Sequence, residues 1–84
     1  MPHAPQPIEV DARGEICPAP MLRAVEGMKA AAEGQSVEVL TDFLPAILTI
    51  TNMAVKQGWD VTVRRRAIKE WSIVLVRAPS VSPA

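Results

Sequence analysis

Two prolines that follow the only cysteine restrict the first half of this chain more than any other feature. Residues 17–20 read Cys-Pro-Ala-Pro, and residues 11–14 before them read Asp-Ala-Arg-Gly. Proline suits the first helical position because its fixed φ is already helical and its missing N–H would have had no partner there. The sequence therefore predicts a helix that begins at Pro18, with Cys17 as the N-cap residue.

A cysteine in this position has a chemical consequence. The positive end of the helix dipole stabilises a thiolate, which would make Cys17 a better nucleophile. Both prolines lack an N–H, so Ala19 and Met21 supply the amide donors that remain in the first turn. The alternative is that Cys17 is a small buried hydrophobe, the commoner fate of free cysteines. The Gly14 turn before the thiol and the stiff chain after it favour the reactive thiol.

The residues around the turn are candidates for supporting roles. Arg13 adds positive potential near the thiol, or else it is a solvated loop charge or an ion-pair partner of Asp11 or Glu15. Asp11 is expected to bond turn amides, a structural role, and not to act as an acid or base. Gly14 supplies a backbone angle that a side chain would forbid, or clearance for a partner's thiol. The predicted site is thus Cys17, supported by Arg13, Gly14, Pro18, Ala19 and Pro20, with Asp11 as a turn residue.

Length and composition exclude several classes of protein. The 84 residues, 49% of them apolar, fit one small globular domain. A formal net charge of zero gives no reason to expect direct nucleic-acid binding. One cysteine excludes an internal disulfide or a Cys-x-x-Cys redox pair, and one cysteine with one histidine argues against a zinc site. We therefore expect neither a metal nor another cofactor.

The ends of the chain and the absence of long apolar runs suggest where the protein works. No apolar run approaches the roughly 18 residues of a membrane span, and the N-terminus has no stretch resembling a signal peptide. We expect a cytoplasmic protein without membrane contact, in which the thiol stays reduced. Residues 1–7 and 79–84, rich in proline, alanine and serine, are predicted to be flexible tails around a single domain at 8–78.

The spacing of apolar residues changes period several times between these tails. It predicts strands at 8–11, 36–41, 60–66 and 70–77, a helix at 18–32 ended by Gly34 as a left-handed cap, and a helix at 45–57 closed by Gly58. The order β-α-β-α-β-β combines a parallel pair with a final hairpin. We therefore expect an α/β (α+β) two-layer sandwich, with a four-stranded mixed sheet and two helices on one face.

Three surfaces could contact partners. The second helix has no charged residue before Lys56, so it could form an interface or an oligomer contact. The sheet face away from the helices could do the same through Leu40, Val74 and Val76. The basic cluster at 64–66, with Lys69, is either a solvated hairpin end or a docking site for an acidic partner or for tRNA held by that partner.

The motif Asp-x-Arg-Gly-x-x-Cys-Pro-x-Pro at 11–20, together with the order of elements over roughly 8–77, resembles the TusA/SirA family of small sulfur-carrier proteins. The resemblance implies that Cys17 accepts sulfane sulfur as a persulfide from a donor protein, such as a cysteine desulfurase or a rhodanese. A thiol acceptor protein would then take it for tRNA thiolation, cofactor assembly or sulfur oxidation. The chain would act as a co-substrate in persulfide transfer, so the resemblance does not decide whether it is itself an enzyme.

The chain also departs from the family pattern at several places. Residues 42–46 read Asp-Phe-Leu-Pro-Ala where the family usually has Asp-Asp-Pro-Ala, and Thr49 stands at a usually acidic position. Val25 and Glu26 occupy positions that commonly hold lysine. These differences leave the donor and the acceptor open. The alternative function is a regulatory or scaffolding module in which Cys17 carries no sulfur, whereas a thiol-disulfide oxidoreductase is disfavoured by the missing second cysteine.

Overall fold

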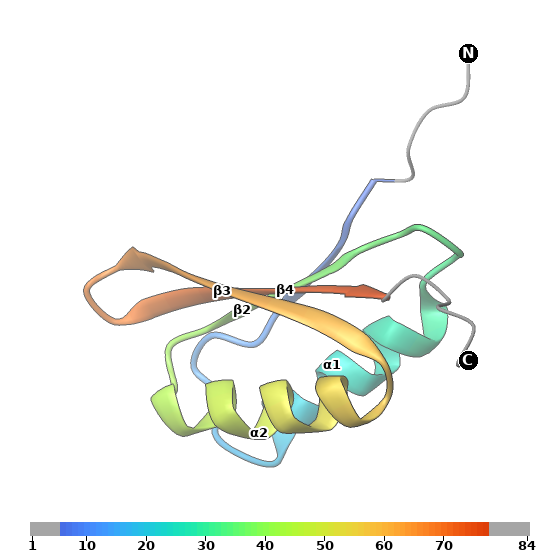
Figure 1. Cartoon of the computed structure of the whole chain (residues 1–84). Helices are drawn as coiled ribbons and strands as arrows, with labels where there is room; N and C mark the ends of the chain where they lie inside the picture. Colours follow the sequence, from blue (N-terminus) through green and yellow to red (C-terminus); the bar gives the residue numbers. More distant parts are fainter. Residues whose placement is uncertain (1–5, 78–84) are drawn as a thin grey trace.

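The computed structural model describes residues 6–77, and its six elements follow the predicted order β-α-β-α-β-β (Figure 1). The expected tails at 1–7 and 79–84 lie outside the described residues, except for residues 6 and 7. The elements are β1 (Ile8–Asp11), α1 (Ala19–Ala30), β2 (Val37–Thr41), α2 (Leu44–Lys56), β3 (Trp59–Ala67) and β4 (Glu70–Arg77).

The four strands form one mixed sheet in the order β1-β2-β4-β3. β1 runs parallel to β2, and the other two pairs are antiparallel. Both helices lie on the same side of the sheet in Figure 1. α1 contacts β1 and β2, whereas α2 contacts β2 and β3. The prediction of a two-layer sandwich with a four-stranded mixed sheet is confirmed.

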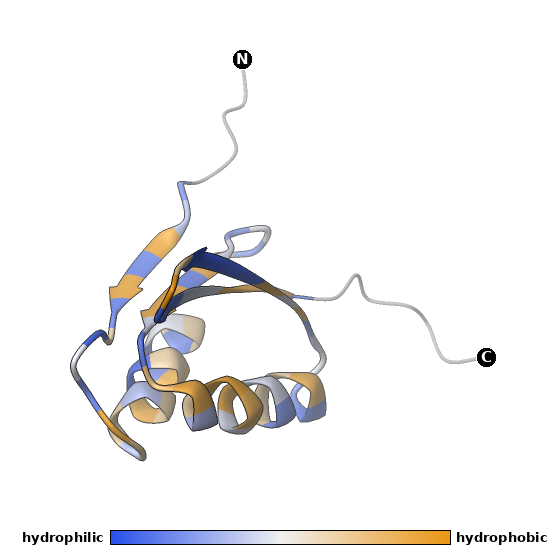
Figure 2. Cartoon of the chain, turned by 90° about the vertical axis from the view of Figure 1, so that its left-hand side faces the viewer, coloured by the Kyte–Doolittle hydropathy of each residue, from blue (hydrophilic) through white to orange (hydrophobic). Residues whose placement is uncertain are grey.

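The core lies between the helices and the inner face of the sheet. The register places Val39 opposite Ile73 and Val37 opposite Leu75, and all four side chains are fully buried. Figure 2 shows how hydrophobic residues alternate along β1 and dominate α2. Close approach of α1 to the sheet requires Gly27, where an added Cβ would lie 3.0 Å from Val37 Cγ1. Burial of these apolar side chains is the main force that fixes the two layers.

The end of α1 differs from the prediction. The helix stops at Ala30, and Ala31 is extended, with its N–H donating to the Met28 carbonyl at 3.3 Å. Gly34 is left-handed, with φ +83°, but it belongs to a separate turn closed by the Gln35 N–H on the Ala32 carbonyl at 2.9 Å. The prediction of Gly34 as the helix cap is wrong, because the chain becomes extended before it reaches the glycine.

The other boundaries fall close to the predicted ones. β2 begins one residue later than predicted, and α2 begins and ends one residue earlier. Gly58, with φ +84°, follows the C-cap residue Gln57 and reverses the chain after α2. Trp59 opens β3, 6% exposed, and the Arg77 guanidinium lies over its ring at 4.9 Å from the centroid.

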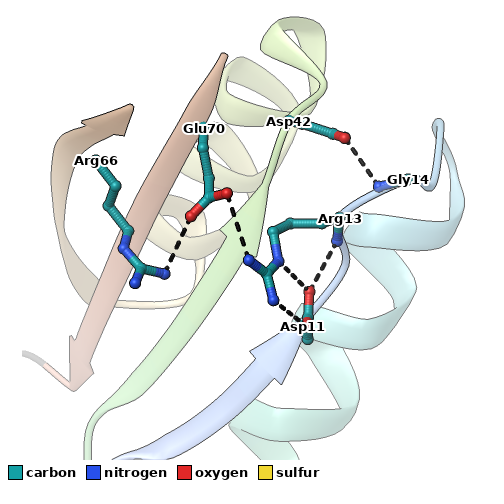
Figure 3. A network of polar contacts seen from close by, with 6 residues as sticks. All are labelled: Asp11, Arg13, Gly14, Asp42, Arg66 and Glu70. Atoms are coloured by element: carbon teal, nitrogen blue, oxygen red, sulfur yellow. Dashed lines mark hydrogen bonds and ion pairs between the residues drawn. The ribbon is translucent and has the colours of Figure 1, made fainter. Parts of the chain in front are cut away.

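The outer sheet face is less apolar than the sequence suggested. Leu40 is only 4% exposed, so it cannot be part of an exposed patch. It lies on a central strand, and the Arg13 side chain crosses that strand to reach Glu70 (Figure 3). Val74 is half-buried and Val76 is 41% exposed. The apolar surface expected of this face is therefore confined to β4.

The solvent side of α2, in contrast, is apolar. Leu44, Leu48 and Val55 are 59%, 69% and 59% exposed. They share one stripe, because residues separated by four or eleven positions lie on the same side of a helix. Within residues 6–77, no helix is long and apolar enough to span a membrane.

Candidate functional site

Cys17 lies in the loop between β1 and α1, half-buried, with its thiol free. Its Sγ is 4.0 Å from the Thr49 hydroxyl on α2, the one side-chain hydrogen bond that Cys17 makes within residues 6–77. That hydroxyl in turn donates to the Pro45 carbonyl at 3.3 Å. The cysteine packs against the edge of the core, so it is neither fully buried nor free on the surface. The peptide bond between Cys17 and Pro18 is cis.

The start of α1 differs from the prediction by one residue. Pro18, with φ −93° and ψ 7°, is the N-cap, and Cys17 stands before it. The Ala19 N–H donates to the Ile16 carbonyl at 3.0 Å, and the Leu22 N–H donates to the Pro18 carbonyl at 3.0 Å. This turn delays the first helical residue to Ala19 and occupies the Ala19 amide. Cys17 is therefore not the N-cap, and Ala19 is not a free donor for an anion.

The remaining predicted proline has a packing role. Pro20 is among the fully buried side chains, inside the first turn of α1, whereas Pro18 is exposed. The two prolines therefore act on different sides of the chain. Pro20 anchors the helix start to the core, and Pro18 forms part of the surface beside the thiol.

Arg13 is the centre of a network on the open side of the sheet (Figure 3). Its Nε and Nη2 donate to the two Asp11 carboxylate oxygens at 2.8 and 2.7 Å, and Nη1 pairs with Glu70 at 3.4 Å. Glu70 also pairs with Arg66 at 3.3 Å. Of the alternatives for Arg13, the structure therefore places its charge in ion pairs and not at the thiol.

These contacts affect the ionisation of both partners. The pKa of Asp11 is lowered to about 2. The largest cause is hydrogen bonding from the Arg13 side chain, and the second is the hydrogen bond from the Arg13 backbone N–H. The pKa of Arg13 is raised above its usual range, mainly by its hydrogen bond to Asp11 and secondly by its hydrogen bond to Glu70. The Arg13 N–H to Asp11 bond, 3.1 Å, closes the turn that leads to the thiol loop. Asp11 thus bonds a turn amide in the way the sequence suggested.

Gly14 and Glu15 connect this network to the thiol. Gly14 has φ +83°, a conformation that L side chains rarely adopt, and no atom lies within 4 Å of an added Cβ. Its N–H donates to an Asp42 carboxylate oxygen at 3.0 Å. Glu15 pairs with Arg23 of α1 at 2.7 Å, so a cation compensates its charge. The loop is thereby tied to the start of α1 and to the end of β2.

Three residues of the site were not assigned a role from sequence. Asp42 follows β2 in a turn, where an acidic residue is a common amide acceptor, so its position was a usable signal. Thr49 was noticed only as a departure from the family pattern. Glu70 lies 57 positions from Arg13, and no local pattern could have indicated that pairing. In the structure, Asp42 and Glu70 contact the start of the thiol loop at Gly14 and Arg13. Thr49 contacts its end at Cys17.

The arrangement suits a thiol that reacts with groups supplied by another molecule. Among the described residues, no acid, histidine or lysine hydrogen-bonds the Cys17 sulfur, whose nearest polar partner is a hydroxyl. Ile16, which precedes Cys17 in the chain, is 67% exposed, so an apolar side chain stands next to the thiol at the surface. Cys17 can attack, or leave, as a thiolate, but it has no dedicated base of its own.

Comparisons with known proteins find a family and several relatives that this chain resembles. Residues 8–77 match the family described as Sulfurtransferase TusA. A putative sulfur carrier protein of Methanocaldococcus jannaschii is 30% identical over 67 residues, which cover 80% of this chain and 89% of that protein. Another, from Archaeoglobus fulgidus, is 29% identical and covers 81% of this chain and 93% of its own length. The solved SirA-like protein of Desulfitobacterium hafniense superposes with a TM-score of 0.76 and 25% identity, over 86% of this chain and 99% of that one.

Proposed function

The chain belongs to the TusA/SirA family of sulfur carriers, and from that premise we propose that it carries sulfane sulfur as a persulfide on Cys17. The observation that supports this most is the place of Cys17, half-buried and lacking a second cysteine, between an anchored loop and α2. A carrier must expose a thiol to two different partners and must not oxidise on a neighbouring thiol. Both requirements are met by this arrangement.

The reaction needs no redox partner beyond the donor persulfide. The Cys17 thiolate attacks the outer sulfur of a donor persulfide, the donor's S–S bond breaks, and the donor leaves as a thiolate. An acceptor thiolate then attacks the outer sulfur on Cys17, and Cys17 leaves as a thiolate. Each step breaks one sulfur–sulfur bond and forms one, so atoms and electrons balance. The chain returns to its starting state, as expected of a co-substrate.

Residues around Cys17 contribute to this exchange by position. The Thr49 hydroxyl, 4.0 Å from Sγ, can turn from the Pro45 carbonyl toward the sulfur and donate to the thiolate. Gly14 leaves open space on the outer side of the loop for a partner. The partners are a sulfur-donor protein and a thiol-acceptor protein. We propose the cytoplasm as the place of exchange, because a free thiol stays reduced there.

Loading the protein in vitro tests the proposal. The chain is incubated with a cysteine desulfurase and cysteine, or with a rhodanese and thiosulfate, and its intact mass is measured. We expect one added sulfur atom on Cys17, lost on treatment with a reductant. Cys17→Ser should gain nothing, and Thr49→Val should load more slowly. A wild-type protein that gains no sulfur from either donor would favour the scaffolding alternative. That alternative predicts that Cys17→Ser leaves the regulatory or scaffolding role largely intact.

A further inference from the structure

A surface groove runs along α2 away from the thiol. It has a volume of about 440 Å³ and is lined by Thr49, Asn52, Met53, Lys56 and Gln57. The Thr49 hydroxyl also lies 4.0 Å from the Cys17 sulfur, so one end of the groove is adjacent to the residue that neighbours the thiol. These five residues recur at intervals of three and four positions and therefore form one stripe of the helix.

A second hollow continues from the far end of this groove. It has a volume of about 250 Å³, and its lining includes Val25 and Lys29 of α1 together with Gln57, Trp59 and Arg77. Gln57 lines both hollows, so they adjoin at the C-terminal end of α2. The first is lined by α2 and its C-cap residue alone, and the second also by α1. Together they form a surface that extends from Thr49 to the end where α2 meets β3. We call it the interhelical groove.

The charges of the interhelical groove are all of one sign. Lys56, Lys29 and Arg77 line it, no acidic side chain does, and none of the three makes an ion pair within residues 6–77. Arg77 stacks on the Trp59 ring, which holds its guanidinium in place. Glu26 is the one acidic residue of α1, and it does not line either hollow. The far end of the groove is thus a fixed positive surface.

The two ends of the groove differ in character. Ile16, the residue before Cys17, is an exposed apolar side chain, and the near end of the groove is lined by the uncharged Thr49 and Asn52. From Thr49 to Lys56 the helix rises about 10 Å, which is the length of about three residues of extended chain. A ligand that places sulfur at Cys17 would therefore meet cations about three or four residues further along its own chain.

We propose that the interhelical groove binds an extended acidic segment of the protein that exchanges sulfur with Cys17. The segment would carry its reactive cysteine beside Ile16 and Cys17 and its acidic side chains three or four residues away, against Lys56 and Lys29. This inference rests on the proposed function for the identity of the partner. A protein segment is favoured over RNA because the formal net charge of the chain is zero and the residue next to the thiol, Ile16, is an exposed apolar side chain.

Model peptides provide the test. One synthetic peptide has a single cysteine followed, three to five positions later, by three glutamates, and its control has glutamines there. Each cysteine is supplied as a mixed disulfide with thionitrobenzoate. The Cys17 thiolate attacks the peptide sulfur, a Cys17–peptide disulfide forms, and coloured thionitrobenzoate leaves as a thiolate. At low ionic strength the glutamate peptide should react about fivefold faster than the glutamine peptide, and the difference should shrink in high salt.

Charge-reversed variants identify the surface. Lys29→Glu with Lys56→Glu should remove the preference for glutamate, whereas two single controls should each keep it: Lys69→Glu at the exposed hairpin end and Arg64→Glu on the outer face of β3. All variants should react equally with iodoacetamide, which is small and uncharged, and should show unchanged circular dichroism. Wild-type protein that reacts equally with both peptides would overturn the inference. So would a preference lost in either control variant.

Two further outcomes separate this inference from its alternatives. A single-stranded RNA of about twelve nucleotides should not slow the glutamate peptide; if it protects Cys17 as strongly as an unreactive acidic peptide does, the commitment to a protein segment is wrong. Sulfur loading is measured on the same samples. Loading without a preference for glutamate would contradict the groove alone, whereas a preference without loading would contradict the proposed carrier function.

Discussion

The two faces of the sheet are held by different forces, and the thiol loop is attached to both. On the covered face, fully buried Val37, Val39, Ile73 and Leu75 pack against the helices. On the open face, ion pairs connect Asp11 through Arg13 and Glu70 to Arg66, across the strands (Figure 3). The loop that carries Cys17 begins at the network and ends in the core.

The comparison explains how a short loop can hold a reactive residue still. Ala12 is fully buried and its N–H donates to the Leu40 carbonyl at 2.8 Å, so the loop leaves the sheet from a fixed point. Pro20 is buried at the other end. Between them, Arg13 and Gly14 are held by polar contacts that water can compete for. Burial should therefore set global stability, and the polar contacts should set the local order of the loop.

The largest effect is expected on the covered face. Ile50 of α2 is fully buried, and Ile50→Ala should lower the free energy of unfolding by about 2–5 kcal/mol, from lost burial and the cavity left behind. Chemical denaturation followed by Trp fluorescence measures it. Leu48→Ala is the matched control, because Leu48 is on the same helix but 69% exposed, and it should change stability little. Equal losses in the two variants would contradict the assignment of α2's buried side.

A smaller and more local effect is expected on the open face. Arg13→Gln removes both ion pairs of Arg13, so the loop should open more often while the core stays folded. Hydrogen exchange should become faster at the Gly14 amide and stay unchanged at Ile73. Arg65→Gln is the control, because Arg65 bonds the Ala67 and Ile68 carbonyls of the hairpin. It should loosen the hairpin and leave exchange of the Gly14 amide unchanged. Faster exchange of Gly14 in this control would show that the ion pairs of Arg13 are not what keeps the loop ordered.

The smallest effect depends on pH. The pKa of Asp11 falls from 3.8 to about 2 on folding, so its contribution to stability is complete above about pH 5 and is lost as pH falls through about 4 toward 2. Asp11→Asn should therefore lower the melting temperature at pH 7, and its difference from wild type should shrink over that window. In an Arg13→Gln background, Asp11→Asn should have little further effect at any pH. A difference that does not shrink between pH 5 and pH 2 would show that the ion pair is not its cause.

The same comparison shows what the sequence could predict. The element order, the inner positions of Val37 and Val39, and the glycine that follows α2 were predictable because each depends on local spacing or on one backbone angle. The motif of the cysteine and the two prolines after it is visible in the sequence for the same reason, because it is local. The pairing of Arg13 with Glu70 and the burial of Leu40 were not predictable, because both depend on which exposed side chains the sheet order brings together.

The error at the start of α1 has a similar origin. The two prolines correctly indicated a helix start, but the Ala19 amide is occupied by the Ile16 carbonyl, and the helix begins one residue later than Pro18. A sequence pattern fixes which residues favour a helix start, and the turn before it decides which amide remains free. The position of the thiol is therefore determined by the contacts of its loop and by Thr49, and not by a place at the helix cap.

A pulse and chase with radiolabelled sulfur shows whether Cys17 takes up sulfur and releases it to an acceptor. The protein is loaded from labelled cysteine by a cysteine desulfurase, separated from the donor, and then mixed with a thiol acceptor protein. We expect about one equivalent of reductant-labile label on the wild-type protein and none on Cys17→Ser. The label should then move to the acceptor protein, and the free thiol of Cys17 should be recovered. Label that is absent from wild type, that remains on Cys17→Ser, or that no acceptor thiol removes would contradict the carrier function.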